Sequence, residues 1–286
     1  MAKRLNHSSR VNPAGLASII LDHMSNTIGM GVQNNSERSK FENEVNRIVE
    51  AGNAAGLTLR LLGSLAFHHH CPHYGYLQAK MGRAYTDIDF AGYGKQAAQI
   101  RKWMPAALGY REDAEVFINS GGARMIFEHP ANGLHVDIFV DKLDFCHTIL
   151  WNGRLEKDSP TIPLAEMVLE KLQIVKINEK DIIDMIMLLL EHPWGDHDAE
   201  TIHLPYITKI CADDWGFWRT VTTNLDKVKR LAQTYTTLSD DEKAKVASQV
   251  DQALNAINAT PKSFGWKMRD KIGDKVKWYK DVEEVK

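Results

Sequence analysis

Apolar residues in the first half of the chain fall in short runs that predict β-strands, at residues 57–62, 86–91, 123–129 and 134–140. The segment Pro130-Ala131-Asn132-Gly133 is a strong turn signal, so the last two strands should form a hairpin. Apolar residues at helical spacing predict helices around this set, one from Ser36 as N-cap to Gly56 and one over residues 95–108.

The second half has a different pattern, in which helical periodicity replaces short apolar runs. Pro163 stands where a helix should begin. Helices are predicted at residues 164–175, 181–191, 205–223, 226–236 and 239–258. Strands followed by helices indicate an α+β fold, with a mixed sheet and flanking helices followed by a helical C-terminal part. We therefore expect one domain over residues 1–160 and a helical domain over residues 161–286.

Composition places the chain among ordinary globular proteins, because 44% of its 286 residues are hydrophobic and 25% are charged. A net charge of −2 is too small for a polycation that coats nucleic acid. The three cysteines are an odd number and lie far apart, which favours a reducing compartment without disulfides. The apolar runs at residues 16–21 and 182–190 are too short to span a bilayer. We expect a cytoplasmic protein with no membrane partner.

The chemistry begins with the sequence Thr86-Asp87-Ile88-Asp89-Phe90. Side chains alternate along a strand, so Asp87 and Asp89 point to the same face. Two neighbouring carboxylates repel each other and favour a bound cation. Magnesium suits them, since it binds one or two carboxylates together with phosphates.

A third carboxylate, Asp137, lies within the apolar run of residues 134–140. If that strand lies beside the strand of Asp87, Asp137 completes a triad. Three carboxylates would hold two Mg²⁺ ions, one at the attacking group and one at a triphosphate and its leaving group. Asp141 and Asp144, which follow, are interpreted as surface charges.

Gly63 and Ser64 follow the first predicted strand and should open a helix. Glycine permits close approach of a phosphate to the backbone. The free N–H groups at a helix start, with the Ser64 hydroxyl, favour anions. A Gly-Ser turn, paired aspartates on one strand and a single aspartate on a later strand together suit a metal-bound nucleoside triphosphate.

These motifs resemble those of the DNA polymerase β-type nucleotidyltransferase superfamily, and the similarity covers roughly residues 57–191. Residues 164–166, 170–172 and 180–184 resemble the C-terminal helices of its AbiEii-like branch, which includes toxins of toxin–antitoxin and phage-defence systems. The resemblance implies a nucleotidyltransferase that moves a nucleotidyl group from an NTP, such as ATP, to an acceptor hydroxyl on RNA, tRNA or protein, with release of pyrophosphate. It also implies a possible cognate antitoxin.

The resemblance also implies residue roles. Gly63 and Ser64 would contact the triphosphate, and Asp87 and Asp89 would bind metal. Asp137 would complete the catalytic triad and help to activate the acceptor. Further along the chain, Lys171 would approach the phosphates, while Asp181 would lie near the nucleotide or position that lysine. The spacing departs from the family pattern, because 22 residues separate Ser64 from Asp87, more than is usual in the family.

Simpler interpretations exist for the charged residues among these. Asp87 and Asp89 would also suit a solvated strand end. Lys171 would suit the wet face of its helix. Asp181 would suit a helix start, where the dipole favours a negative charge. For the protein as a whole, a catalytically silent nucleotide-binding regulatory protein is the alternative to an enzyme.

The extra segment carries His68, His69, His70, Cys71 and His73. Zinc binding by this cluster would make the protein an interaction module. Consecutive residues cannot all converge on one ion, so contacts with phosphate or acceptor are favoured, and Arg83 could do the same.

Near the C-terminus, basic and aromatic residues are interleaved between residues 262 and 279. This composition either binds single-stranded nucleic acid or forms an amphipathic helix docked by its aromatic side chains. Docking is favoured over nucleic-acid binding.

Overall fold

The computed structural model describes residues 38–81 and 84–282. Contacts divide the chain into two compact units, Met1–Phe41 and Glu42–Lys286, and the second contains every element discussed below. The predicted N-cap Ser36 and the candidate residue Arg83 lie outside the described residues.

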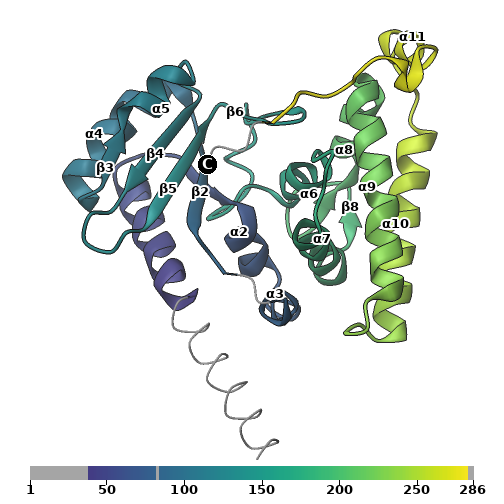
Figure 1. Ribbon diagram of the computed structural model, residues 1–286, viewed down its shortest axis with the longest axis horizontal. Helices are drawn as coiled ribbons and strands as arrows, with labels where there is room; N and C mark the ends of the chain where they lie inside the picture. Colours follow the sequence, from purple (N-terminus) through teal and green to yellow (C-terminus); the bar gives the residue numbers. More distant parts are fainter. Residues whose placement is uncertain (1–37, 82–83, 283–286) are drawn as a thin grey trace, which may run out of the picture. The chain divides into compact units, whose positions relative to one another are not determined.

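A five-stranded mixed sheet forms the centre of the strand-rich half (Figure 1). Its strand order is β1 (Leu59–Leu62), β2 (Asp87–Gly92), β5 (His135–Val140), β4 (Arg124–Glu128) and β3 (Arg111–Asp113). Strands β2 and β5 are parallel, and the other neighbours are antiparallel. The four predicted strands are therefore present, and the predicted hairpin is β4–β5.

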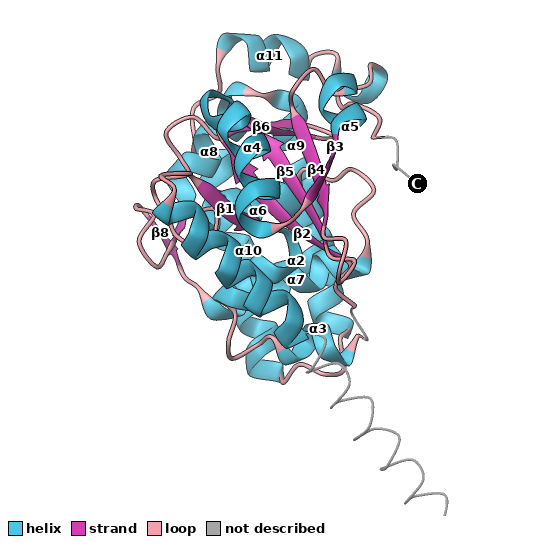
Figure 2. Ribbon diagram, turned by 90° about the vertical axis from the view of Figure 1, so that its left-hand side faces the viewer, coloured by secondary structure: helices cyan, strands magenta, loops and turns pink. Residues whose placement is uncertain are grey.

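Helices cover both faces of this sheet (Figures 1 and 2). A helix that includes residues 42–54 lies with α4 (Ala97–Leu108) on one side. On the other side lies α2 (Gly63–His70), which packs against α6 (Leu164–Leu172) and α7 (Glu179–Glu191). Helices of the second half of the chain thus pack against α2, which begins directly after the last residue of β1.

Helix α7 is buried over residues 181–190, because its sequence is apolar on almost every side. The polar exceptions are Asp181 and Asp184, and Asp184 is fully buried. A charged residue at this depth requires partners, and the site described below supplies them.

The remaining helices follow as α8 (Leu204–Asp213), α9 (Trp215–Thr234), α10 (Asp240–Ala259) and α11 (Phe264–Asp270). The predicted helix start at residue 205 is confirmed to within one residue, whereas the predicted break at residues 223–226 is wrong. Asp214 ends α8 in extended backbone and caps α9 by accepting from the Phe217 N–H, so the break falls ten residues earlier and α9 continues through residue 225. The short elements are α3 (Tyr76–Lys80), η1 (Gly94–Gln96), α5 (Ala114–Asn119), β6 (Lys142–Asp144), β7 (Thr148–Leu150), β8 (Trp194–Gly195), β9 (Ile202–His203) and η2 (Gly273–Lys275).

The α+β prediction is confirmed, with a mixed sheet, flanking helices and a helical C-terminal part. The division at residue 160 stays a prediction. All three cysteines are free and buried, in agreement with the expectation of no disulfide framework. Across residues 38–81 and 84–282, no helix is both long and apolar enough to cross a membrane.

Candidate active site

Asp89 and Asp137 stand directly opposite each other on the parallel strands β2 and β5. Asp87, two residues earlier on β2, shares their face because side chains alternate along a strand. The condition set by the sequence is therefore met: the Asp137 strand lies beside the Asp87 strand. Sheet pairing alone brings three carboxylates together from positions 50 residues apart in the chain.

Gly63 opens α2 beside these carboxylates, since Leu62 at the end of β1 pairs with Asp89. Its φ of +71° lies in the left-handed region that glycine tolerates best. A Cβ added to Gly63 would meet Asp89 Oδ2 at 2.5 Å, which is closer than side chains pack. Glycine is thus needed here both for the turn and for the approach of a carboxylate.

A cavity of about 260 Å³ lies over these carboxylates. Five of the residues predicted from the sequence line it: Gly63, Asp87, Asp89, Asp137 and Lys171. Ser64 lies in the first turn of α2 but does not line the cavity, and its carbonyl accepts a hydrogen bond from Gln78 Nε2 at 3.2 Å. Asp181 also lies outside the lining, behind Lys171.

Lys171 is buried rather than on a wet helix face, being 6% exposed. Its Nζ lies 3.1 Å from Asp181 Oδ1, 3.2 Å from Asp184 Oδ2 and 3.6 Å from a Glu170 oxygen. Asp184 Oδ1 also accepts from Gln78 Nε2 at 2.7 Å. The ammonium is therefore fixed between α6 and α7 by carboxylates. Asp181 has two roles at once, because it lies in the first turn of α7 and also holds Lys171.

Glu170 is a site residue that the sequence analysis missed. It lines the cavity, and its Oε2 accepts a hydrogen bond from the Gly63 N–H at 3.3 Å. Burial raises the pKa of Glu170 to about 7, opposed by Lys171 and by the Gly63 amide. The amide that the sequence assigns to a phosphate is thus bonded to a carboxylate of this chain. The sequence signal for Glu170 was its position directly before Lys171.

Arg124 is the second missed residue. Its Nε lies 3.0 and 2.8 Å from the two Asp137 oxygens, and its NH2 also bonds Oδ2. Arg124 pairs with Phe139 on the antiparallel strand β5, so its side chain reaches Asp137 diagonally across the ladder. The signal lay in the predicted hairpin, which places residue 124 near residue 137 once the turn is recognised.

The electrostatics of the site reflect an excess of negative charge. Burial raises the pKa of Asp89 well above its ordinary value, and the charges of Asp87, Asp137 and Glu170 add to this, with Lys171 opposing. Burial also raises the pKa of Asp137, although the Arg124 guanidinium holds it back. Four carboxylates therefore share one cavity with two cations, Arg124 and Lys171.

A divalent cation fits the donor chemistry of this cavity, because carboxylate oxygens are the ligands that Mg²⁺ prefers. As the side chains stand, the described part of the chain has no group of three or more His, Cys, Asp or Glu placed to hold an ion. The Arg124 ion pair with Asp137 accounts for this within the triad. Asp87 and Asp89 are two ligands of the kind that Mg²⁺ combines with phosphate oxygens, so they would hold it when a triphosphate is present.

The histidines of the inserted segment point to different partners. His68 Nε2 lies 3.5 Å from Glu42, His70 Nε2 lies 2.6 Å from Thr161 Oγ1, and His73 pairs with Glu191. Each of these three histidines thus contacts a different segment, whereas the ring of His69 lies against that of His70. These contacts attach α2 and the following loop to the rest of the fold, which leaves the zinc interpretation without support.

The aromatic residues near the C-terminus pack onto α9. The Trp266 and Trp218 rings lie 5.0 Å apart, and the Trp278 indole donates to Thr220 Oγ1 at 3.0 Å. Only Phe264 is strongly exposed among the four aromatic side chains of this segment. The contacts agree with the docked-helix interpretation rather than with a stacking surface for nucleic acid.

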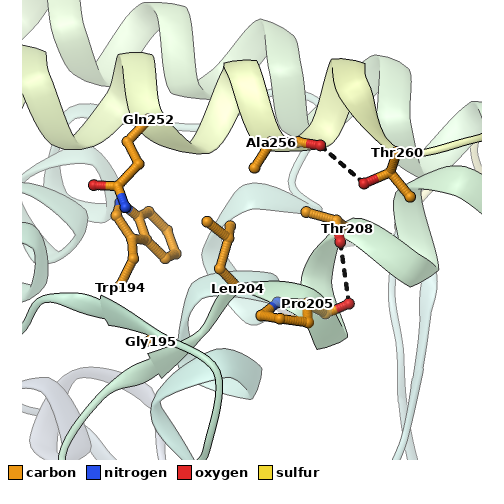
Figure 3. Close-up of a pocket in the computed structure, with 8 residues that line it drawn as sticks. All are labelled: Trp194, Gly195, Leu204, Pro205, Thr208, Gln252, Ala256 and Thr260. Carbon is orange, nitrogen blue, oxygen red and sulfur yellow. Dashed lines mark hydrogen bonds between the residues drawn. The ribbon is translucent and has the colours of Figure 1, made fainter.

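A second hollow, of about 290 Å³, lies between α8 and α10 beside β8 (Figure 3). Trp194, Leu204 and Ala256 give it an apolar lining. Its two threonine hydroxyls, of Thr208 and Thr260, donate to carbonyls of their own helices. None of the carboxylates of the candidate active site lines this hollow.

Comparisons with known proteins give little further guidance. No protein-family model matches the chain, and no curated protein matches it. Among solved structures, the chain is similar to the crystal structure of an antigenic nucleotidyltransferase-like protein from Paracoccidioides brasiliensis. The two are 11% identical, the match covers 81% of this chain and 97% of that chain, and the TM-score is 0.38. A similarity at this level carries no argument, so the functional proposal rests on the geometry of the site.

Proposed function

We propose that this protein is a metal-dependent nucleotidyltransferase, which moves a nucleotidyl group from an NTP to an acceptor hydroxyl and releases pyrophosphate. The observation that carries the proposal is the pairing of Asp89 with Asp137 on adjacent parallel strands, with Asp87 on the same face and Gly63 against Asp89. Buried carboxylates gathered in this way destabilise a protein unless they serve a cation or a reaction.

We assign roles to charged residues of the cavity from their positions and, for Asp137, from its pKa. Asp87 is exposed and Asp89 is half-buried, and both line the cavity. Burial raises the pKa of Asp137 above that of an ordinary aspartate, which favours it as a proton acceptor for the attacking hydroxyl. Lys171 and Arg124 supply fixed positive charge to the phosphates. Positioning and charge stabilisation account for most catalysis of this kind.

Magnesium, held by Asp87 and Asp89, would supply positive charge to the triphosphate and to the leaving pyrophosphate. A second ion would need Asp137, whose carboxylate is bound by Arg124 in this structure. The two-metal arrangement therefore requires Arg124 to release Asp137. A guanidinium freed in this way would remain beside the cavity and could bind a phosphate.

The same ion pair favours a second candidate function, a nucleotide-binding regulatory protein without turnover. If Arg124 keeps Asp137 permanently, the acceptor hydroxyl lacks its base while Asp87, Asp89 and Lys171 still bind a triphosphate. Such a protein would bind NTP tightly and release no pyrophosphate.

The acceptor and the biological role are the finer parts of the proposal. The resemblance seen in the sequence points to RNA, tRNA or a protein as acceptor, to a toxin-like role and to a cognate antitoxin. These stay predictions.

Label transfer tests the enzyme proposal and names the acceptor class together. The protein is incubated with magnesium and an α-labelled NTP in a cell extract, beside an Asp87→Ala variant. Because Asp87 is exposed, this variant should fold normally. We expect a labelled RNA or protein band with the wild type and none with the variant. Binding of NTP without any label transfer would favour the regulatory protein.

A further inference from the structure

The cavity over the carboxylates also has an apolar part of its lining, which consists of Phe139, Leu143, Phe145 and Ile174. Phe139 follows Asp137 by two residues on β5, so it shares the face of the triad. It stands opposite Ala91, two residues beyond the Asp89–Asp137 pair, at a rise of roughly 3.3 Å per residue. The lining thus changes from ionic to apolar along the strand direction.

This apolar wall is partly open to the cavity. Phe139 and Leu143 are buried, whereas Phe145 and Ile174 are half-exposed. The Phe139 and Phe145 rings meet edge to face, 5.5 Å apart, which fixes the orientation of Phe145. Half-exposed apolar side chains beside a charged site are suited to a ligand that has both an ionic end and an apolar, planar end.

The wall also has little means of distinguishing one base from another. Bases differ in the pattern of donors and acceptors along their edges. Among the described residues that line the cavity, none is Asn, Gln, Ser or Thr. The guanidinium of Arg124 lies 5.4 Å from the centre of the Phe139 ring, and Asp137 holds it there. A ring held here is held by stacking and apolar contact, which every base offers.

We propose that the wall of Phe139, Leu143, Phe145 and Ile174 binds the nucleobase of the NTP, and that it accepts all four bases with similar affinity. This inference rests on the proposed function, because it uses the same cavity. It adds the substrate class: any ribonucleoside triphosphate rather than a single one.

Binding measurements on the full chain test this proposal with two kinds of probe. Dissociation constants are measured by calorimetry, with magnesium, for ATP, GTP, CTP and UTP and for inorganic tripolyphosphate, which has no base. We expect the four NTPs to agree within about fivefold and tripolyphosphate to bind at least about tenfold more weakly, since stacking contributes about 1–3 kcal/mol per base.

Variants of Phe145 test whether the apolar wall makes the contact with the base. Phe145→Ala should weaken NTP binding by about fivefold or more and leave tripolyphosphate binding unchanged, while Phe145→Trp should retain NTP binding. Phe264→Ala, which removes an exposed phenylalanine on α11, is the matched control and should change neither.

Two results would overturn the proposal while leaving the nucleotidyltransferase proposal intact. One is tripolyphosphate binding as tight as NTP binding, with no effect of Phe145→Ala. The other is a preference of about 100-fold or more for one base. If the protein binds neither NTP nor tripolyphosphate, the proposed function itself is wrong, and the nucleobase proposal is wrong with it.

Discussion

Arg124 on β4 holds the carboxylate of Asp137 on β5 through both of its oxygens, on the face of the sheet where the triad gathers. Bidentate guanidinium–carboxylate pairs are among the stronger side-chain interactions in proteins. The two partners differ in exposure, since the Arg124 side chain is 30% exposed and that of Asp137 is 9% exposed. Replacing the two partners one at a time should therefore change the stability of the protein by different amounts.

Arg124→Met should cost more stability than Asp137→Asn. The first leaves a buried carboxylate without its donor, at about 1–3 kcal/mol, whereas the second leaves a guanidinium that water can reach. A double-mutant cycle by urea unfolding should give a favourable coupling of about 1–3 kcal/mol. Additive effects of the two substitutions would show that the ion pair does not stabilise the protein.

Gly63→Ala should disturb both folding and nucleotide binding. The positive φ alone costs about 1–2 kcal/mol for a residue with a Cβ, and the new atom also displaces Asp89. Gly56 is a matched control, because it has the same φ of +71° and open space around its Cβ position. Gly56→Ala should lose only the stability that the positive φ costs, as measured by thermal unfolding, and it should bind NTP as the wild type does. Equal binding by both variants would contradict the role assigned to the Gly63–Asp89 approach.

Stability should fall as the pH rises toward neutrality because of Glu170. Its pKa is raised from 4.5 to about 7 in the folded protein. The stabilising contribution is therefore present below pH 4.5 and is lost as the pH rises through about 7. At about 1.4 kcal/mol per unit, the change amounts to about 3 kcal/mol. Urea unfolding from pH 4.5 to 7.5 measures it, and Glu170→Gln should flatten the profile. A variant profile as steep as that of the wild type would assign the effect to Asp89 and Asp137 instead.

Lys171→Met should destabilise the protein strongly. The ammonium lies among Glu170, Asp181 and Asp184, and its removal leaves buried carboxylates without a cation, at about 3–5 kcal/mol. Lys176→Met is the control, because Lys176 is exposed four residues after the end of α6 and should change stability by less than about 0.5 kcal/mol. Similar unfolding curves for the two variants would mean that Lys171 is not held as described.

The sequence was sufficient for the parts of the site that depend on strand periodicity and chain order. Asp87 and Asp89 share a face because of alternation along one strand, and Gly63 follows a strand in a recognisable turn. Whether β5 lies beside β2 is a long-range pairing, which local pattern does not encode, so the position of Asp137 could only be stated as a condition.

The role of Glu170 was missed because it depends on packing between distant elements. Glu170 reaches the Gly63 amide across 107 residues of sequence. The helix break at Asp214 was missed for a different reason. Apolar periodicity continues across Asp214, while the cap that this residue forms ends one helix and begins the next. Burial of Lys171 likewise depends on α7 supplying two carboxylates, which helix periodicity alone does not reveal.

Paired labelling of the two ends of the triphosphate tests the central claim most directly. Wild type, Asp87→Ala and the control Asp196→Ala, which removes a highly exposed aspartate in the α7–α8 connection, are incubated with magnesium, cell extract and either α-labelled or γ-labelled NTP. The account predicts α-label in an acceptor and γ-label in pyrophosphate, for wild type and Asp196→Ala but not for Asp87→Ala. Transfer of γ-label to an acceptor, or α-label transfer undiminished in folded Asp87→Ala, would contradict it.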